Sequence, residues 1–175
     1  MKPSLIQPNV KRVIPWEERF IMSEEIKAYI AGFLDGDGCL MAQLIKRKGY
    51  KFGFQIRLSL VFYQHKQNIR HLEWLKSLLK TGYIRTRNDN MAEYTIVGIM
   101  PVITVVHKIL PYLRLKKKQA QNLLLFEKIP PKPSKKQFIS FCQLVDNTAK
   151  YNFSKKRKNF TPQVLKYLTE NNLSP

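Results

Sequence analysis

The sequence predicts an α+β fold with an antiparallel sheet, on the basis of three observations. Residues 52–63 alternate between apolar and mostly polar side chains, which is the period of a strand with one buried face. Residues 88–90, Asn-Asp-Asn, form a strong turn signal between two shorter strands. Helical patterns precede, separate and follow these two hairpins, and this order of elements is typical of an α+β domain.

The first helix is predicted to begin at Ser23, which can cap its N-terminus. Glu24 and Glu25 follow in the first turn, where the helix dipole favours acidic side chains. Gly36 and Gly38 are expected to end this helix.

The first hairpin is predicted to pair a strand over Cys39–Ile45 with a longer strand over Tyr50–Tyr63, through a turn at Lys46–Gly49. Because side chains alternate between the two faces of a strand, one face of the long strand would enter the core. The other face would leave Gln55 and Arg57 available for a ligand.

The second helix–hairpin unit repeats this order. A helix is predicted over residues 66–80, and Thr81-Gly82 ends it. The second hairpin pairs Tyr83–Arg87 with Glu93–Val97 around the turn at 88–90.

The rest of the chain is predicted to be helical. Three prolines and a lysine at 130–133 break it, and Ser134 with Gln137 resembles a capping box. The predicted helices run from Pro101 to Leu110, from Lys116 to Ile129, from Ser134 to about Asn147, and onward from Thr161-Pro162.

Three parts follow from this organisation. Residues 1–22, with scattered prolines, are expected to form an N-terminal arm. Residues 23–150 would form the folded core, and residues 151–175 a basic C-terminal segment with its helix.

Charge narrows the partner class. The chain has 31 Lys and Arg residues against 12 Asp and Glu, a formal net charge of +19 and a pI near 10.1. Such a field attracts polyanions, of which DNA and RNA are the leading candidates. A membrane partner is not expected, because no apolar run approaches the roughly 20 residues of a membrane span.

Two distant cysteines and no recognisable signal peptide predict a reducing, intracellular location. The sequence leaves open whether this is a prokaryotic cytoplasm or nucleoid, or an organelle matrix.

Two of the four aspartates, Asp35 and Asp37, lie two positions apart between glycines. Phosphodiester hydrolysis requires a hard divalent cation, and such ions take oxygen ligands. Asp-Gly-Asp-Gly is also a common turn sequence, and this alternative remains open on the residues alone. An EF-hand loop is excluded, because it would need an acid where Lys46 stands and an oxygen ligand where Cys39 stands.

Residues 30–38, Ile-Ala-Gly-Phe-Leu-Asp-Gly-Asp-Gly, resemble the motif that names the LAGLIDADG homing endonucleases. The similarity continues over about residues 23–150, where the order and spacing of residues are similar to those of single-motif members encoded in introns. It is carried by the following segments: Ala42-Gln43, Tyr50–Phe52, Gln64, Gly82–Arg85 and Leu113–Ala120. The resemblance implies an αββαββα core, in which helices back a saddle of antiparallel strands. It also implies an endonuclease that makes a double-strand break in a long DNA site and supports intron mobility.

The resemblance also implies an active site. Asp37 would bind the metal together with the carbonyl of Gly36, while Asp35 would support the motif helices. Gln64 would orient water, and Lys116 would stabilise charge or activate water. The expected ion is Mg²⁺, with Mn²⁺ or Ca²⁺ able to occupy the same site.

The sequence departs from some relatives after Gln64. Asn68 stands where those relatives have a further active-site arginine. Whether Arg70 or Lys66 takes that part is left open.

One motif per chain implies a two-fold homodimer, because cutting two strands requires two centres. The residues expected at its interface are Ala31, Gly32, Asp35 and Gly36. The residues expected to contact DNA are Gln43, Lys46, Lys48, Lys51, Gln55, Arg57, Ser59, Arg85, Arg87 and Arg114. Tyr63 and the basic run 155–158 are expected to contact the DNA backbone. A pseudo-palindromic target of roughly 20 base pairs follows from the helical repeat.

Two rival functions remain on the sequence alone. Proteins of this fold also act as RNA maturases or as non-cleaving, sequence-specific DNA-binding proteins, so RNA is a candidate secondary partner. A general basic nucleoid protein is the other rival, and it predicts binding that lacks sequence preference as salt rises.

Overall fold

The computed structural model describes residues 22–152 and 158–171. The predicted N-terminal arm lies outside these residues except for Met22, which is buried, and so does the basic run except for Lys158. The helices are α1 (Glu24–Asp37), α2 (Ile69–Leu79), α3 (Ile99–Ile109), α4 (Lys117–Leu124), α5 (Lys135–Ala149) and α6 (Thr161–Glu170). The strands are β1 (Gly38–Lys46), β2 (Phe54–His65), β3 (Tyr83–Thr86) and β4 (Met91–Val97).

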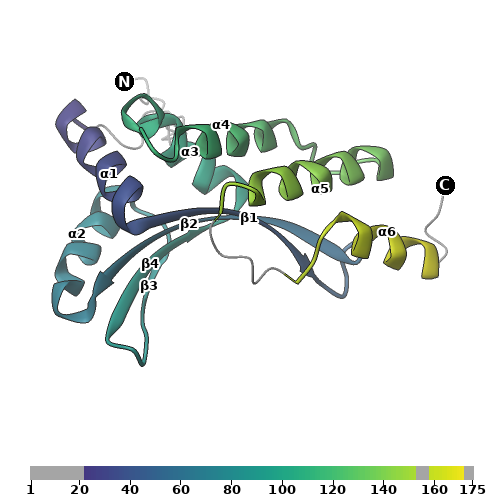
Figure 1. The fold of residues 1–175 in the computed structure, drawn as a ribbon, viewed down its shortest axis with the longest axis horizontal. Helices are drawn as coiled ribbons and strands as arrows, with labels where there is room; N and C mark the ends of the chain where they lie inside the picture. The colour runs from purple at the N-terminus through teal and green to yellow at the C-terminus, as the bar shows by residue number, and fades with distance from the viewer. Residues whose placement is uncertain (1–21, 153–157, 172–175) are drawn as a thin grey trace, which may run out of the picture.

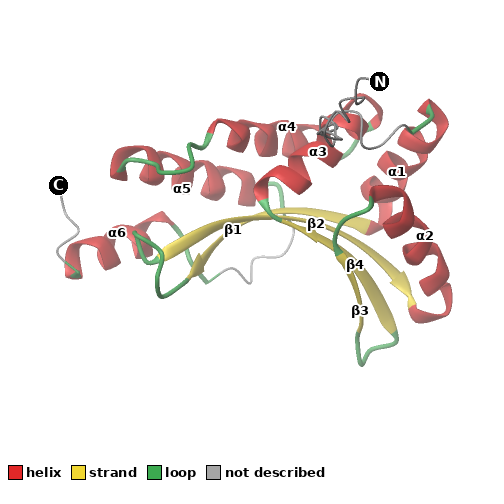
Figure 2. Cartoon of the chain, turned by 180° about the vertical axis from the view of Figure 1, so that it is seen from behind, coloured by secondary structure: helices red, strands yellow, loops and turns green. Residues whose placement is uncertain are grey.

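The strands form one antiparallel sheet in the order β1-β2-β4-β3. The sheet is strongly curved, with α1 to α5 on one face (Figure 1; Figure 2 shows it from behind). No helix of the described residues covers the hollow of the other face. This is the predicted saddle of strands backed by helices. The predicted order of two helix–hairpin units followed by helices is confirmed.

The core lies between the sheet and these helices. Leu40, Leu58, Phe62, Tyr94 and Ile96 point from the sheet into it and are fully or almost fully buried. Phe62 stacks on Phe33 of α1 and on Tyr94, with ring centroids 5.3 and 6.0 Å apart. Burial of this apolar face fixes the register of the strands, because a slip of one residue would turn it to solvent.

Two predicted helix boundaries are confirmed by their caps. The Ser23 hydroxyl accepts the N–H of Ile26, and the Ser134 hydroxyl accepts the N–H of Gln137. The Gln137 side chain in turn accepts the N–H of Ser134, which completes the capping box.

Three boundaries differ from the prediction. Helix α1 continues through Gly36 to Asp37, because its C-terminus is closed by the N–H of Gly38 on the carbonyl of Leu34. Strand β2 begins at Phe54 instead of residue 50, because residues 50–53 form a turn in which the N–H of Gly53 donates to the carbonyl of Tyr50. Strand β4 begins two residues earlier than predicted, at residue 91.

Two helical segments also differ from the prediction. The helix expected over residues 116–129 is α4 followed by a 3₁₀ turn over Leu125–Lys128. A 3₁₀ turn over Lys66–Asn68 likewise precedes α2. In the described part of the chain, no helix has the length and hydropathy needed to cross a membrane.

Helix α6 packs at the far end of the first hairpin (Figure 1). Its Val164 and Leu168 are buried in the same core as the sheet. The ring of Tyr167 meets Phe54 edge to face at 5.5 Å and lies where a side chain at position 53 would stand, so Gly53 is required there. The C-terminal helix is therefore packed against the core.

Candidate active site at the end of the first helix

The two carboxylates of the acidic motif have different surroundings. Asp35 is 9% exposed and accepts three backbone N–H groups, from Arg114 and Leu115 on Oδ2 (2.7 and 3.1 Å) and from Lys116 on Oδ1 (2.9 Å). Asp37 is exposed and makes no hydrogen bond or ion pair with any described residue. Asp35 is therefore a structural anchor, and Asp37 is left with free oxygens.

The anchor brings Lys116 to the end of α1. Besides donating its N–H to Asp35, Lys116 donates from Nζ to the backbone carbonyl of Asp35 at 2.6 Å. Burial raises the pKa of the neighbouring Cys39 thiol, and the charge of Lys116 opposes that shift. The segment predicted to supply a catalytic lysine is thus held beside the motif by hydrogen bonds between residues that are 79 to 81 positions apart in the sequence.

The end of α1 suits a divalent cation. The last carbonyls of a helix have no partner within the helix, and the dipole favours positive charge there. Asp37 adds a carboxylate, and Gly36 is exposed with open space around its Cα. Among the described residues there is no group of three His, Cys, Asp or Glu side chains that could hold a metal.

Gln64 lies at the same end of the β1–β2 ladder as Asp37. The ladder begins with Gly38 paired to Phe62, so Gln64 and Asp37 are both just beyond it. The Gln64 Oε1 atom accepts the N–H of His65 and the side-chain amide of Asn68, each at 3.0 Å. With its oxygen engaged, Gln64 presents its Nε2 donor group.

Asn68 therefore contacts Gln64. From the sequence, Asn68 was noted only as a departure from some relatives. Lys66 and Arg70 are both exposed. Which of them, if either, serves the active site stays open.

The hollow face of the sheet carries most of the residues predicted to contact DNA. Arg57 and Gln43 face each other across β2 and β1 and are hydrogen-bonded. Arg85 forms an ion pair with Glu93, its partner across β3 and β4, at 2.7 Å. Arg87 forms one with Asp89 at 2.7 Å.

Glu93 was missed by sequence reasoning. It is only 8% exposed, and it also lies 3.9 Å from Arg87. The signal was present, because Arg85 and Glu93 flank the predicted turn at positions that pair in an antiparallel hairpin.

The three lysines of the first hairpin that are predicted to contact DNA lie at its tip. Lys46, Lys48 and Lys51 are exposed there. The Nζ atom of Lys46 lies 5.2 Å from the centre of the Tyr167 ring, which ties the tip to α6.

Ser59 does not match its predicted role. It was expected to present its hydroxyl to DNA, but its side chain is 3% exposed. Its cross-strand neighbours, Met41 and Val97, surround it on the hollow face and leave it out of reach of a base edge. The alternation along β2 predicted correctly that Ser59 lies on the hollow face, but it could not predict that larger neighbouring side chains bury it.

The four residues predicted at the dimer interface differ in their exposure on α1. Gly32 and Gly36 are exposed, and an added Cβ at either position would meet nothing within 4 Å. Ala31 is 0% exposed and packs in the chain's own core, so it is not available to a second chain. Asp35 is likewise turned inward, to the segment beginning at Arg114.

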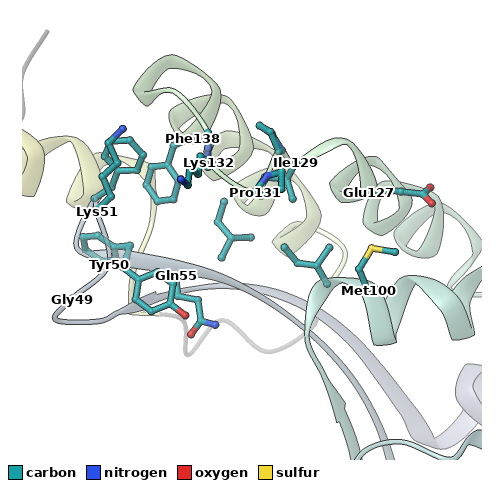
Figure 3. Close-up of a pocket in the computed structure, with 16 residues that line it drawn as sticks. Gly49, Tyr50, Lys51, Gln55, Met100, Glu127, Ile129, Pro131, Lys132 and Phe138 are labelled. Carbon is teal, nitrogen blue, oxygen red and sulfur yellow. The ribbon is translucent and has the colours of Figure 1, made fainter. Parts of the chain in front are cut away.

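A separate groove of about 710 Å³ lies at the other end of β1, away from Asp37. Tyr50 and Gln55 line one side of it and Pro131 and Phe138 the other (Figure 3). Its only acidic side chain is Glu127. This groove therefore has no group of carboxylates for hydrolysis.

Comparison with known proteins agrees with this arrangement. A family model described as LAGLIDADG endonuclease matches residues 30–130. The chain is 35% identical over 131 residues to DNA endonuclease I-CvuI of Chlorella vulgaris, covering 74% of this chain and 81% of that protein. It is 36% identical over 138 residues to DNA endonuclease I-CreI of Chlamydomonas reinhardtii, covering 78% and 84% respectively.

Solved structures show the same fold. The crystal structure of I-CvuI in complex with its target in the presence of 2 mM Ca superposes with a TM-score of 0.79 at 33% identity, covering 83% of this chain and 94% of that one. An archaeal intron-encoded homing endonuclease, I-Vdi141I complexed with DNA, shares the fold at 19% identity with a TM-score of 0.69, covering 87% of this chain and 100% of that one. The chain therefore belongs to the LAGLIDADG endonuclease family.

Proposed function

We propose that this protein is a homing endonuclease that makes a double-strand break in a long DNA site by divalent-metal-dependent hydrolysis. The observation that carries this proposal is the contrast between the two motif carboxylates. Asp35 is saturated by three N–H donors, whereas Asp37 ends the helix with free oxygens. A carboxylate without partners in a chain of net charge +19 is suited to hold a cation next to a bound polyanion.

In this proposal, Asp37 and the carbonyl of Gly36 bind Mg²⁺, an ion that takes oxygen ligands. The ion supplies charge neutralisation and a more acidic bound water. Lys116 keeps its ammonium group at the end of α1, where it stabilises negative charge on a phosphate. Gln64, held by Asn68, donates a hydrogen bond that orients the attacking water. Related structures determined with Ca or Mg support the use of a divalent ion.

We propose that two copies of the chain form the active enzyme. A single chain contributes one free carboxylate at this end of the fold, and two strands require two centres. The exposed stripe formed by Gly32 and Gly36 allows two α1 helices to approach closely. Two Asp37 carboxylates would then lie on either side of the two-fold axis, and the DNA target would be pseudo-palindromic.

The hollow face of the sheet binds the DNA in this proposal. Its curvature suits a cylinder, and its arginines can contact bases while the lysines at the hairpin tip contact phosphates. The DNA complexes of I-CvuI and I-Vdi141I support this choice of partner.

The test is cleavage of a plasmid library that carries randomised duplex inserts, by the purified protein with Mg²⁺ or with EDTA. We expect linear plasmid only with Mg²⁺, and enrichment of one pseudo-palindromic sequence among the cut inserts. A transcript of the same sequence, incubated in parallel, would reveal RNA binding. No cutting of any insert, or cutting that persists in EDTA, would contradict the proposed function.

A further inference from the structure

Gln43 and Arg57 form a hydrogen-bonded pair on the hollow face of the sheet. They are direct partners in the β1–β2 register, and both are partly buried. The Gln43 Oε1 atom accepts from Nε of Arg57 at 3.3 Å and from Nη2 at 2.8 Å. Because a guanidinium has only donors, the amide of Gln43 must turn its oxygen toward Arg57.

This pairing fixes which groups remain for a ligand. The edge of the guanidinium formed by Nε and Nη2 is occupied by Oε1 of Gln43. The end formed by Nη1 and the second hydrogen of Nη2 is left free, and it is a fork of two parallel donors. Gln43 retains only the two hydrogens of its Nε2 group. The pair therefore offers donors and no acceptor from either side-chain head.

Bases differ in how they meet such a surface. Guanine presents two adjacent acceptors, O6 and N7, in the major groove and is the base that a donor fork matches. Adenine presents one acceptor and one amino donor, and a glutamine reads it by using both its oxygen and its nitrogen. Gln43 cannot do this while its oxygen is held by Arg57. Cytosine presents an amino donor, which an all-donor pair rejects.

We infer that Gln43 and Arg57 act as one unit that selects guanine at one position of each half-site. Arg57 makes the base contact, and Gln43 is a positioning residue that aims it and does not itself read adenine. This inference rests on the proposed function, because it requires the hollow face to bind DNA.

The position of the pair favours a base over a phosphate. Arg57 lies on β2, an inner strand of the sheet, and its stem is partly buried between its neighbours. Its partner is neutral, so its charge is not cancelled, in contrast to Arg85, which is paired with Glu93. Because Gln43 holds the guanidinium, Arg57 loses little conformational freedom on binding, which lowers the entropic cost of the contact.

The experiment is selection of bound duplexes from a randomised half-site library in Ca²⁺. The wild-type protein is compared with Arg57→Lys, Gln43→Leu and Gln43→Glu. Thermal melting of each variant establishes that it is folded. We expect wild type to prefer guanine at one position by roughly 5- to 150-fold, the range of one good bidentate contact.

Arg57→Lys should flatten that position because a lysine keeps the charge but lacks the fork. Gln43→Leu should flatten the same position although Arg57 is still present, because nothing then holds its Nε edge. Gln43→Glu should keep the preference for guanine, since a carboxylate holds the arginine as well as the amide does. Gln121→Leu is the control, because Gln121 is exposed on α4, on the opposite side of the sheet, and this variant should leave the guanine preference unchanged.

Three results would overturn the inference. Gln43→Leu could leave the guanine preference intact, which would mean that Arg57 needs no positioning. The two residues could govern different positions, with Gln43 selecting adenine, or Arg57→Lys could weaken all sequences equally, which is the behaviour of a phosphate contact. In each of these cases the other positions of the half-site would still be selected. If wild type selected no sequence at any position, the proposed function would fail as well.

Discussion

Replacing Asp35 by asparagine changes one oxygen to an NH₂ group and removes the negative charge. In the native protein Oδ2 accepts the N–H groups of Arg114 and Leu115, and Oδ1 accepts that of Lys116. An asparagine oxygen placed at Oδ2 keeps two of these bonds. Its NH₂ group then faces the N–H of Lys116, and two donors cannot pair.

The free energy of this change follows from the bonds. A hydrogen bond to a charged group contributes about 1.5–3 kcal/mol, and one to a neutral group about 0.5–1.5 kcal/mol. Loss of one charged bond costs about 1.5–3 kcal/mol and weakening of two others costs about 2–3 kcal/mol, which gives a destabilisation of about 3.5–6 kcal/mol. For a chain of this size, that lowers Tm by roughly 7–24 °C.

The assay is urea and thermal denaturation of wild type, Asp35→Asn and Asp37→Asn. Asp37→Asn is the matched control, because the same chemical change is made two residues away at an exposed carboxylate without described partners. We expect it to change the free energy of unfolding by less than about 0.5 kcal/mol, as for an ordinary surface substitution. The reasoning is refuted if the two variants lose the same stability, or if Asp35→Asn loses none.

Three further predictions concern other parts of the site and the core. Gly32→Leu should abolish dimerisation and double-strand cutting, measured by analytical ultracentrifugation and plasmid cleavage. The melting temperature of the chain should be retained, because a Cβ at this position meets nothing within 4 Å. A dimer that persists would contradict the proposed α1 interface. Tyr94→Phe should lower the free energy of unfolding by about 1–2 kcal/mol, because the hydroxyl of the buried Tyr94 donates to the carbonyl of Thr81 at 2.6 Å. No loss in urea denaturation would count against that bond. Burial raises the pKa of Tyr94, so this contribution should not change between pH 6 and pH 9. Lys116→Met should lower the single-turnover cleavage rate by on the order of 10²-fold, because it removes a charge from the end of α1. The backbone N–H at position 116 would still donate to Asp35, so the segment stays anchored. An unchanged rate would exclude Lys116 from catalysis.

Local patterns were sufficient for much of the fold. The cap at Ser23, the capping box at Ser134 and the turn at residues 88–90 each depend on contacts within a few residues, and the structure has all three. The alternation along β2 identified the buried face correctly, because it reflects the geometry of the strand itself.

Contacts between distant residues were not predictable in this way. Nothing in the order of residues indicates that Asp35 binds the chain at Arg114, because that contact is made by folding. The burial of Ser59 likewise depends on the size of the neighbouring side chains on other strands. The inward turn of Ala31 could have been inferred, since it lies one position from Ile30 and three from Leu34, both of which are fully buried.

The two motif carboxylates have different roles, with Asp37 binding the metal and Asp35 anchoring the segment at Arg114, and mixing Asp37→Asn with wild type tests this assignment. Cleavage of a supercoiled plasmid carrying the target is measured with wild type alone, Asp37→Asn alone and an equal mixture, each with Mg²⁺. We expect linear plasmid from wild type, no cutting by the variant despite retained binding of the target, and nicked plasmid from mixed dimers. Double-strand cutting by Asp37→Asn alone would contradict it.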